Sequence, residues 1–149
     1  MLVHFPIALL SVYALMEILR VKRLTAWPPW FHIKATFVII GVLSAIPTAV
    51  SGLLIQPEFA VGERAIAILD RHLLFALAAV TVFFFLAILY AFAWRGGAKA
   101  RAFVASPWSV ILAIIGLILI TITGALGGGF VHGSEVDPMV SLVFKLLGL

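Results

Sequence analysis

The chain has 149 residues, of which 64% are hydrophobic and 11% are charged, and its mean hydropathy is +1.26. A soluble domain carries about a quarter charged residues, so this composition excludes a water-soluble fold. The sequence contains no cysteine, which excludes disulfides, thiolate catalysis, cysteine-held iron–sulfur clusters and covalent haem attachment.

The first apolar segment, residues 4–20, predicts a retained membrane span. Residues 1–6 lack the basic region of a secretory signal, and no small-residue cleavage site follows them. Pro6 lies near the start of the segment, where the missing N–H costs little. The basic residues Arg20, Lys22 and Arg23 end it.

Three further spans follow, at about residues 31–55, 72–94 and 107–130. Pro47 predicts a kink in the second of them, and the Ser106-Pro107 pair predicts the start of the last. Residues 138–148 are too few to cross a bilayer and predict a helix along the interface. We therefore expect one all-α transmembrane domain over residues 1–149: an up-and-down four-helix bundle with a short C-terminal interfacial helix.

Basic residues gather at one end of this arrangement, which predicts the cytoplasmic side. That end holds Arg20, Lys22, Arg23, Lys34, Arg95, Lys99 and Arg101, whereas the other holds Arg64, Arg71 and Lys145. Both termini would then face outward. Membrane insertion explains the net charge of +4, so we expect the lipid bilayer and no nucleic acid as a partner.

Three of the four histidines, His4, His72 and His132, fall at the outer end of the predicted spans. Ionisable residues at membrane depth usually mark a pathway, a proton relay or a ligand. The first and third spans of such a bundle run parallel at diagonal corners, so His4 and His72 would approach the central axis. This arrangement predicts the two axial ligands of one haem b, and such a coordinatively closed iron favours electron transfer.

Other residues at the same depth fit a haem but also have simpler interpretations. Gly52 and Gly128 would leave room for the flat macrocycle, Arg71 and Arg64 would meet its propionates, and His132 would accept a quinol proton or bind a propionate. Glycines in membrane helices commonly serve close packing, and interfacial arginines commonly serve as snorkelling anchors. A single histidine at a helix end is commonly a cap, so the prediction rests on the coincidence of three.

At the inner boundary, His32 is expected to be interfacial, with a second haem between it and Met16 as a less favoured alternative. Glu17 lies three residues before Arg20, and an ion pair within one helical turn explains both charges. The sequence has no serine–histidine–acid constellation, phosphate loop or His-x-x-x-His zinc spacing. The sequence therefore shows no residues that would catalyse hydrolysis or phosphoryl transfer.

Four sequence features together resemble a bacterial family of small four-helix membrane proteins. They are residues 3–10 (Val-His-Phe-Pro-Ile-Ala-Leu-Leu), the Ser51-Gly52 pair, His72, and residues 127–133 (Gly-Gly-Gly-Phe-Val-His-Gly). The family is catalogued as domain of unknown function twenty-two thirty-one. The resemblance implies the four-helix topology and a bacterial inner membrane location, and it draws attention to His4 and His72.

Three hypotheses about function follow. The first is a b-type cytochrome subunit that carries single electrons between quinol or an extracytoplasmic cytochrome and a larger complex, rather than an enzyme by itself. The second is a cofactor-free accessory subunit of a respiratory or photosynthetic membrane complex. The third is a transporter or sensor, which the lack of intramembrane charge and of inverted repeats disfavours.

Overall fold

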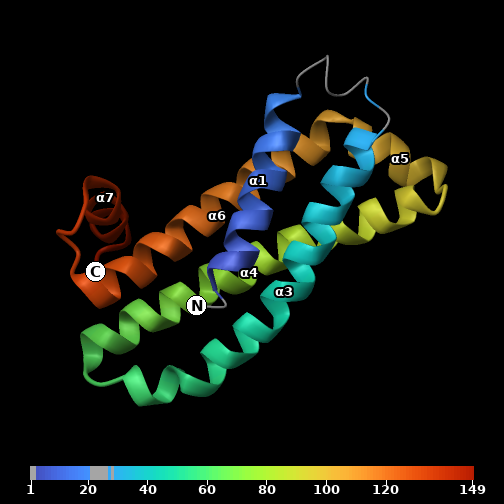
Figure 1. The fold of residues 1–149 in the computed structure, drawn as a ribbon. Helices are drawn as coiled ribbons and strands as arrows, with labels where there is room; N and C mark the ends of the chain where they lie inside the picture. The colour runs from blue at the N-terminus through green and yellow to red at the C-terminus, as the bar shows by residue number, and fades with distance from the viewer. Residues whose placement is uncertain (1–2, 21–26, 28) are drawn as a thin grey trace.

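The computed structural model describes residues 3–20, 27 and 29–149, and every regular element in these ranges is an α-helix. Met1, Leu2, Lys22 and Arg23, which enter the arguments on targeting and orientation, lie outside the described residues. The elements are α1 (His4–Leu19), α3 (Pro29–Phe59), α4 (Glu63–Trp94), α5 (Ala98–Ala105), α6 (Pro107–His132) and α7 (Pro138–Leu147) (Figure 1).

Three of these helices, α3, α4 and α6, are long and apolar enough to cross a membrane. The expected all-helical membrane protein is therefore confirmed. Helix α1, at the first expected span, has 16 residues and is shorter than these three helices. At 1.5 Å per residue it measures about 24 Å, against roughly 30 Å for a bilayer's hydrocarbon core.

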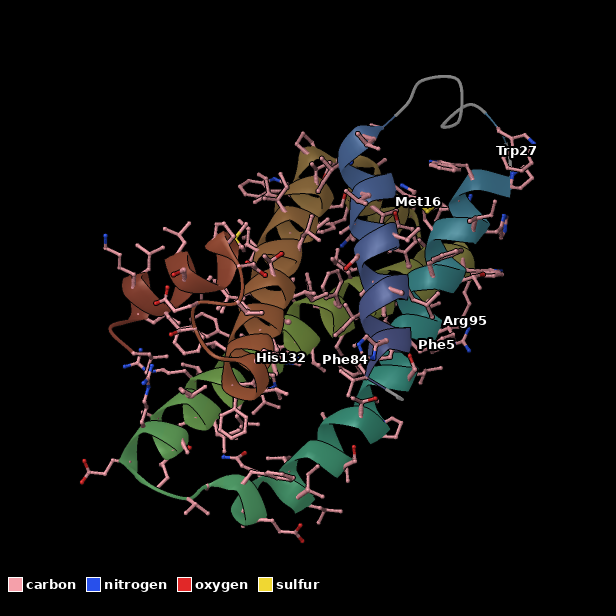
Figure 2. The ribbon with its side chains drawn as sticks, turned by 60° about the vertical axis from the view of Figure 1, so that its left-hand side comes forward. Phe5, Met16, Trp27, Phe84, Arg95 and His132 are labelled. Atoms are coloured by element: carbon pink, nitrogen blue, oxygen red, sulfur yellow. The ribbon has the colours of Figure 1, made fainter. Side chains whose placement is uncertain are left out.

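Helices α1 and α4 meet through side chains, since the ring of Tyr13 lies edge to face with those of Phe83 and Tyr90. Helix α1 packs on α3 and α6, and α4 packs on the same two helices. The up-and-down four-helix bundle, and with it the diagonal placement of the first and third spans, stays a prediction. Helix α1 is inclined to α4 in both views of the ribbon (Figures 1 and 2).

Helix α3 is longer than predicted and leaves its neighbours toward its C-terminal end. Pro47 and Pro57 lie inside it, yet it remains one helix, which bends in its second half (Figure 1). Every residue from 51 to 59 except Gln56 is exposed. The part of α3 that the bend carries away therefore has little contact with the rest of the chain.

Helix α4 begins at Glu63, well before the expected start of this span at residue 72. Gly62, with φ +87°, turns the chain into the helix, and the acidic Glu63 in the first turn suits the helix dipole. His72, expected at the start of the third span, therefore lies inside α4 and not at its first turn. Helix α5 was not predicted, since it has only 8 residues and its Lys99 and Arg101 were assigned to the basic boundary after the third span.

The predicted starts of the last two helices are confirmed. Ser106 caps α6, with the Trp108 N–H donating to Ser106 Oγ at 3.3 Å. Asp137 caps α7, whose Met139 and Val140 N–H groups donate to Asp137 Oδ1 at 2.7 and 2.9 Å. Both use a side-chain acceptor to satisfy free N–H groups in a first helical turn.

The buried side chains form two apolar clusters. The larger lies among α1, α3, α4 and α6 and includes Tyr13, Phe83 and Tyr90. The smaller lies where α4, α6 and α7 meet and includes Leu126 and Phe144. Close helix packing in the larger cluster depends on Gly116 of α6, which faces the ring of Phe83.

We predict that Gly116→Ala lowers the free energy of unfolding by about 1–3 kcal/mol, the usual cost of overpacking a core. A Cβ atom at Gly116 would lie 2.6 Å from Cζ of Phe83, and that ring is fully buried. The measurement is denaturant unfolding in detergent.

Gly124→Ala is the matched control, because a Cβ at this position of the same helix meets nothing within 4 Å. Its stability should equal or slightly exceed that of the wild type. An equal loss in both variants would contradict the packing explanation.

Candidate functional site

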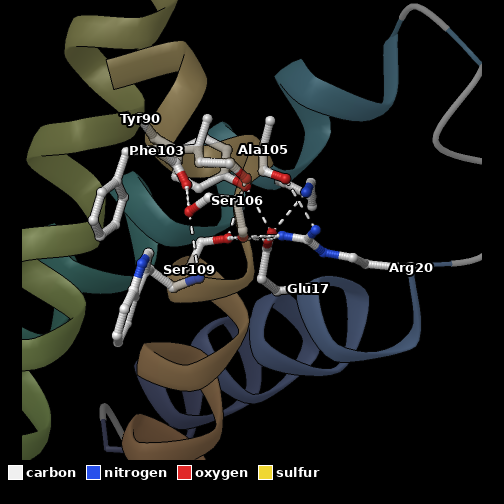
Figure 3. Close-up of polar contacts among 10 residues, drawn as sticks. Glu17, Arg20, Tyr90, Phe103, Ala105, Ser106 and Ser109 are labelled. Atoms are coloured by element: carbon white, nitrogen blue, oxygen red, sulfur yellow. Dashed lines mark hydrogen bonds and ion pairs between the residues drawn. The ribbon is translucent and has the colours of Figure 1, made fainter. Parts of the chain in front are cut away.

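The carboxylate of Glu17 is fully buried and accepts hydrogen bonds from side chains of three other helices and from Arg20. Its Oε2 accepts from Lys34 Nζ at 2.6 Å and from the Tyr90 hydroxyl at 2.7 Å. Its Oε1 accepts from Ser109 Oγ at 2.7 Å and from Arg20 Nη2 at 3.2 Å. Helices α3, α4 and α6 therefore converge on one residue of α1 (Figure 3).

Arg20 extends this network to the junction between α5 and α6. It ends α1 with a left-handed backbone (φ +35°) and donates to the carbonyl oxygens of Ala105 at 3.0 Å and Ser106 at 2.5 Å. It also donates to Ser109 Oγ at 2.9 Å. The planar guanidinium suits such a set of acceptors, because its donors are fixed in a fork (Figure 3).

The network holds one carboxylate and two cations, so its formal charge is positive. Lys34 is only 8% exposed. A buried ion pair gains enough attraction to offset its desolvation only when its geometry is good and its remaining acceptors are satisfied. Here both carboxylate oxygens have two donors each.

Sequence reasoning found only part of this network. The predicted Glu17–Arg20 pair is confirmed at 3.2 Å, but Lys34, Tyr90 and Ser109 were not assigned to it. The premise that charge inside the helices is lacking is wrong, because Glu17 and Lys34 are both buried. An acid and a base at matching depth in two apolar segments were the available signal.

A cavity of about 590 Å³ adjoins the network. Its walls combine cationic, aromatic and small apolar side chains: Arg20, Trp30, Phe31, His32, Lys34, Tyr90, Arg101, Val104 and Ala105. The ring of Phe31 stacks on Tyr90 at 5.6 Å, and His32 meets Trp94 edge to face at 4.9 Å. These contacts fix the aromatic wall, and His32 is exposed as expected of an interfacial residue.

His72 is half-buried against α6. Its Nδ1 lies 3.1 Å from the carbonyl oxygen of Thr123. Gly127 leaves room for the ring, because a Cβ there would lie 3.3 Å from His72 Cε1. The carbonyl can only accept, so this contact is a hydrogen bond when Nδ1 carries the proton, and Nε2 then keeps its lone pair.

The other predicted cofactor residues lie around the same end of the helices. His4, the first residue of α1, and His132, the last of α6, are exposed, as is Arg71 (Figure 2 labels His132). Cβ atoms at Gly52 and Gly128 would meet nothing within 4 Å. Within residues 3–20, 27 and 29–149, no three histidines or acids form a metal-binding group, so the His4–His72 pair stays a prediction.

We predict that Glu17→Gln lowers the free energy of unfolding by about 3–5 kcal/mol, because it leaves the buried Lys34 ammonium without its counter-ion. The measurement is denaturant unfolding in detergent. The double variant Glu17→Gln/Lys34→Met should recover part of the loss, because it removes the unpaired charge.

Glu63→Gln is the control, since Glu63 is an exposed acid in the first turn of α4. A wild-type stability for Glu17→Gln would show that the carboxylate does not hold the helices together.

Comparison with known proteins gives one result. Neither the curated proteins nor the solved structures include a match to this chain. A family model described as "Predicted membrane protein (DUF2231)" matches residues 1–138, which include α1 to α6. The chain therefore belongs to the DUF2231 family of predicted membrane proteins, as its sequence motifs indicated.

Proposed function

We propose that this protein is a membrane-embedded electron-transfer subunit that holds one haem b between His4 and His72. The observation that carries the proposal is the setting of His72. A metal-ligating histidine almost always donates its other ring N–H to a carbonyl, carboxylate or water. The 3.1 Å contact between His72 Nδ1 and the Thr123 carbonyl has this form when Nδ1 carries the proton, and Nε2 is then left for a ligand.

The position of His4 supports the same site. We propose that α1 is the fourth span of an up-and-down bundle. The Glu17–Tyr90 contact at 2.7 Å sets α1 and α4 at the same height. Counted outward from that contact, His4 and His72 differ by about five residues, or roughly 7 Å along the helix axes. The macrocycle would therefore be inclined to the helices.

The shortness of α1 also favours a ligand role for His4. With its inner end fixed by the Glu17 network, a helix of 16 residues leaves His4 below the outer membrane surface. An exposed imidazole at that depth is costly unless it has a partner. Coordination of iron would supply that partner.

The remaining predicted residues fit around this pair. Arg71 would bind propionates by charge-assisted hydrogen bonds, and His132 would bind a propionate or accept a quinol proton. Gly52 and Gly128 present no side chains to the macrocycle. Two imidazole ligands close the iron to substrate, so the subunit would pass single electrons from quinol or an extracytoplasmic cytochrome to a larger complex.

The proposed location is the bacterial inner membrane, with both termini outside. The excess of lysine and arginine near the Glu17 network supports that orientation under the positive-inside rule. The short helix α7 would then lie in the outer interface. Its buried residues Val140, Val143 and Phe144 pack inward, while Leu142 and Leu146 remain exposed to lipid.

A cofactor-free accessory subunit is the second candidate, and the end of α3 favours it. Leu53, Leu54 and Ile55 are 45%, 74% and 50% exposed. These exposed apolar side chains would suit contact with another subunit. The absorption spectrum distinguishes the two functions.

We predict that the purified, dithionite-reduced protein shows the Soret and α bands of a b-type haem. His72→Ala and His4→Ala should each abolish or shift these bands, because each removes one axial ligand. Haem content is measured by pyridine haemochrome.

His32→Ala is the matched control, since His32 lies at the opposite end of the helices and should not change the spectrum. A colourless protein from cells supplied with haem, or unchanged bands in His72→Ala, would overturn the haem proposal. The first result would favour the accessory subunit.

A further inference from the structure

We propose that the cavity beside Glu17 binds the phosphate group of an anionic membrane phospholipid. The site lies at the opposite end of the helices from His4 and His72. It is therefore independent of the haem proposal, and its test does not require a haem.

The positive charge of the cavity favours an anion as its ligand. Three cationic side chains, Arg20, Lys34 and Arg101, line it, and none of the described residues that line it is an acid. Glu17, behind the wall, balances only one of these charges. Excess charge beside a bilayer's apolar region is costly, and a phosphate would offset it.

The donors of the cavity suit phosphate oxygens. Guanidinium groups bind phosphate through paired N–H donors, and an ammonium adds a compact charge. The Arg101 side chain is held in place by a hydrogen bond from its Nε to the carbonyl oxygen of Ala93 at 2.9 Å. This bond uses Nε, and the two terminal nitrogens are the groups that form forked contacts with phosphate.

Trp30 supplies a second observation. Its side chain lines the cavity, and its indole Nε1 is buried without a hydrogen-bond partner in the part of the chain that the structure describes. Buried donors are nearly always paired, and leaving one unpaired costs free energy. A phosphate oxygen would provide the acceptor once the indole turns its Nε1 toward the cavity.

The walls favour a lipid as the source of the phosphate. Phe31, Tyr90 and Val104 give the cavity an apolar side as well as a cationic one. Basic pockets between transmembrane helices bind anionic lipid headgroups in this way. A lipid also brings acyl chains that remain in the bilayer around the exposed apolar faces of the helices.

The test compares delipidated protein in nanodiscs of phosphatidylcholine alone with nanodiscs that also contain phosphatidylglycerol. We expect phosphatidylglycerol to raise the thermal midpoint. It should also stay bound when the protein is extracted from the nanodiscs into detergent and washed, as measured by the ratio of phosphatidylglycerol to phosphatidylcholine in mass spectrometry of the retained lipid. Arg101→Gln should weaken this binding about fivefold, the usual effect of one basic residue on anionic lipid.

Two further variants separate binding from folding. Trp30→Phe keeps the aromatic ring but removes the donor, so it should also weaken binding while the midpoint in phosphatidylcholine stays unchanged. Lys145→Gln, an exposed cation on α7, is the matched control and should bind phosphatidylglycerol as the wild type does.

A last experiment adds inorganic phosphate to the protein in phosphatidylcholine nanodiscs and measures the thermal midpoint. A rise in the midpoint with inorganic phosphate equal to that with phosphatidylglycerol would overturn the lipid source and assign the cavity to a soluble phosphate. No response to either phosphate, or equal responses in the wild type and Arg101→Gln, would overturn the site itself.

Discussion

Burying the Glu17 carboxylate is the constraint on which the arrangement of the helices depends. A carboxylate among apolar helices must have donors for both oxygens, and water is not at hand to supply them. Lys34, Tyr90 and Ser109 provide those donors from three other helices. Each helix is therefore fixed in height and rotation at this point, which apolar contacts alone specify poorly.

The two ends of the molecule differ because only one has this network. Near Glu17 the helices converge, and Arg20 ties the α5–α6 junction to α1. At the other end α3 bends away, and residues 51–59 lose most of their neighbours. The helices are thus fixed relative to one another at the Glu17 end. At the other end, the wider separation of α3 would leave room for a cofactor or a partner subunit.

This division assigns different chemistry to the two ends. The Glu17 end has charged and aromatic groups around a cavity, which suits recognition of an anion at the membrane boundary. The opposite end has imidazoles and glycines, with His72 oriented by the Thr123 carbonyl. Because the Glu17 network fixes α1 relative to α4, it also sets the height of His4 relative to His72. The proposed redox site therefore depends on the buried carboxylate although it is remote from it.

The sequence alone determined the membrane class, the helical content, the helix starts at Ser106-Pro107 and residue 138, and the Glu17–Arg20 pair. These follow from composition, local hydrogen bonding and spacing within one helical turn, which need no knowledge of neighbouring helices. Only the tertiary structure decided that Lys34, Tyr90 and Ser109 meet Glu17, that His72 lies inside α4 against Thr123, and that α3 leaves the other helices. The spans are apolar on all sides, so their sequences do not show which face each turns inward. That choice is made by polar groups brought together from helices far apart in the chain.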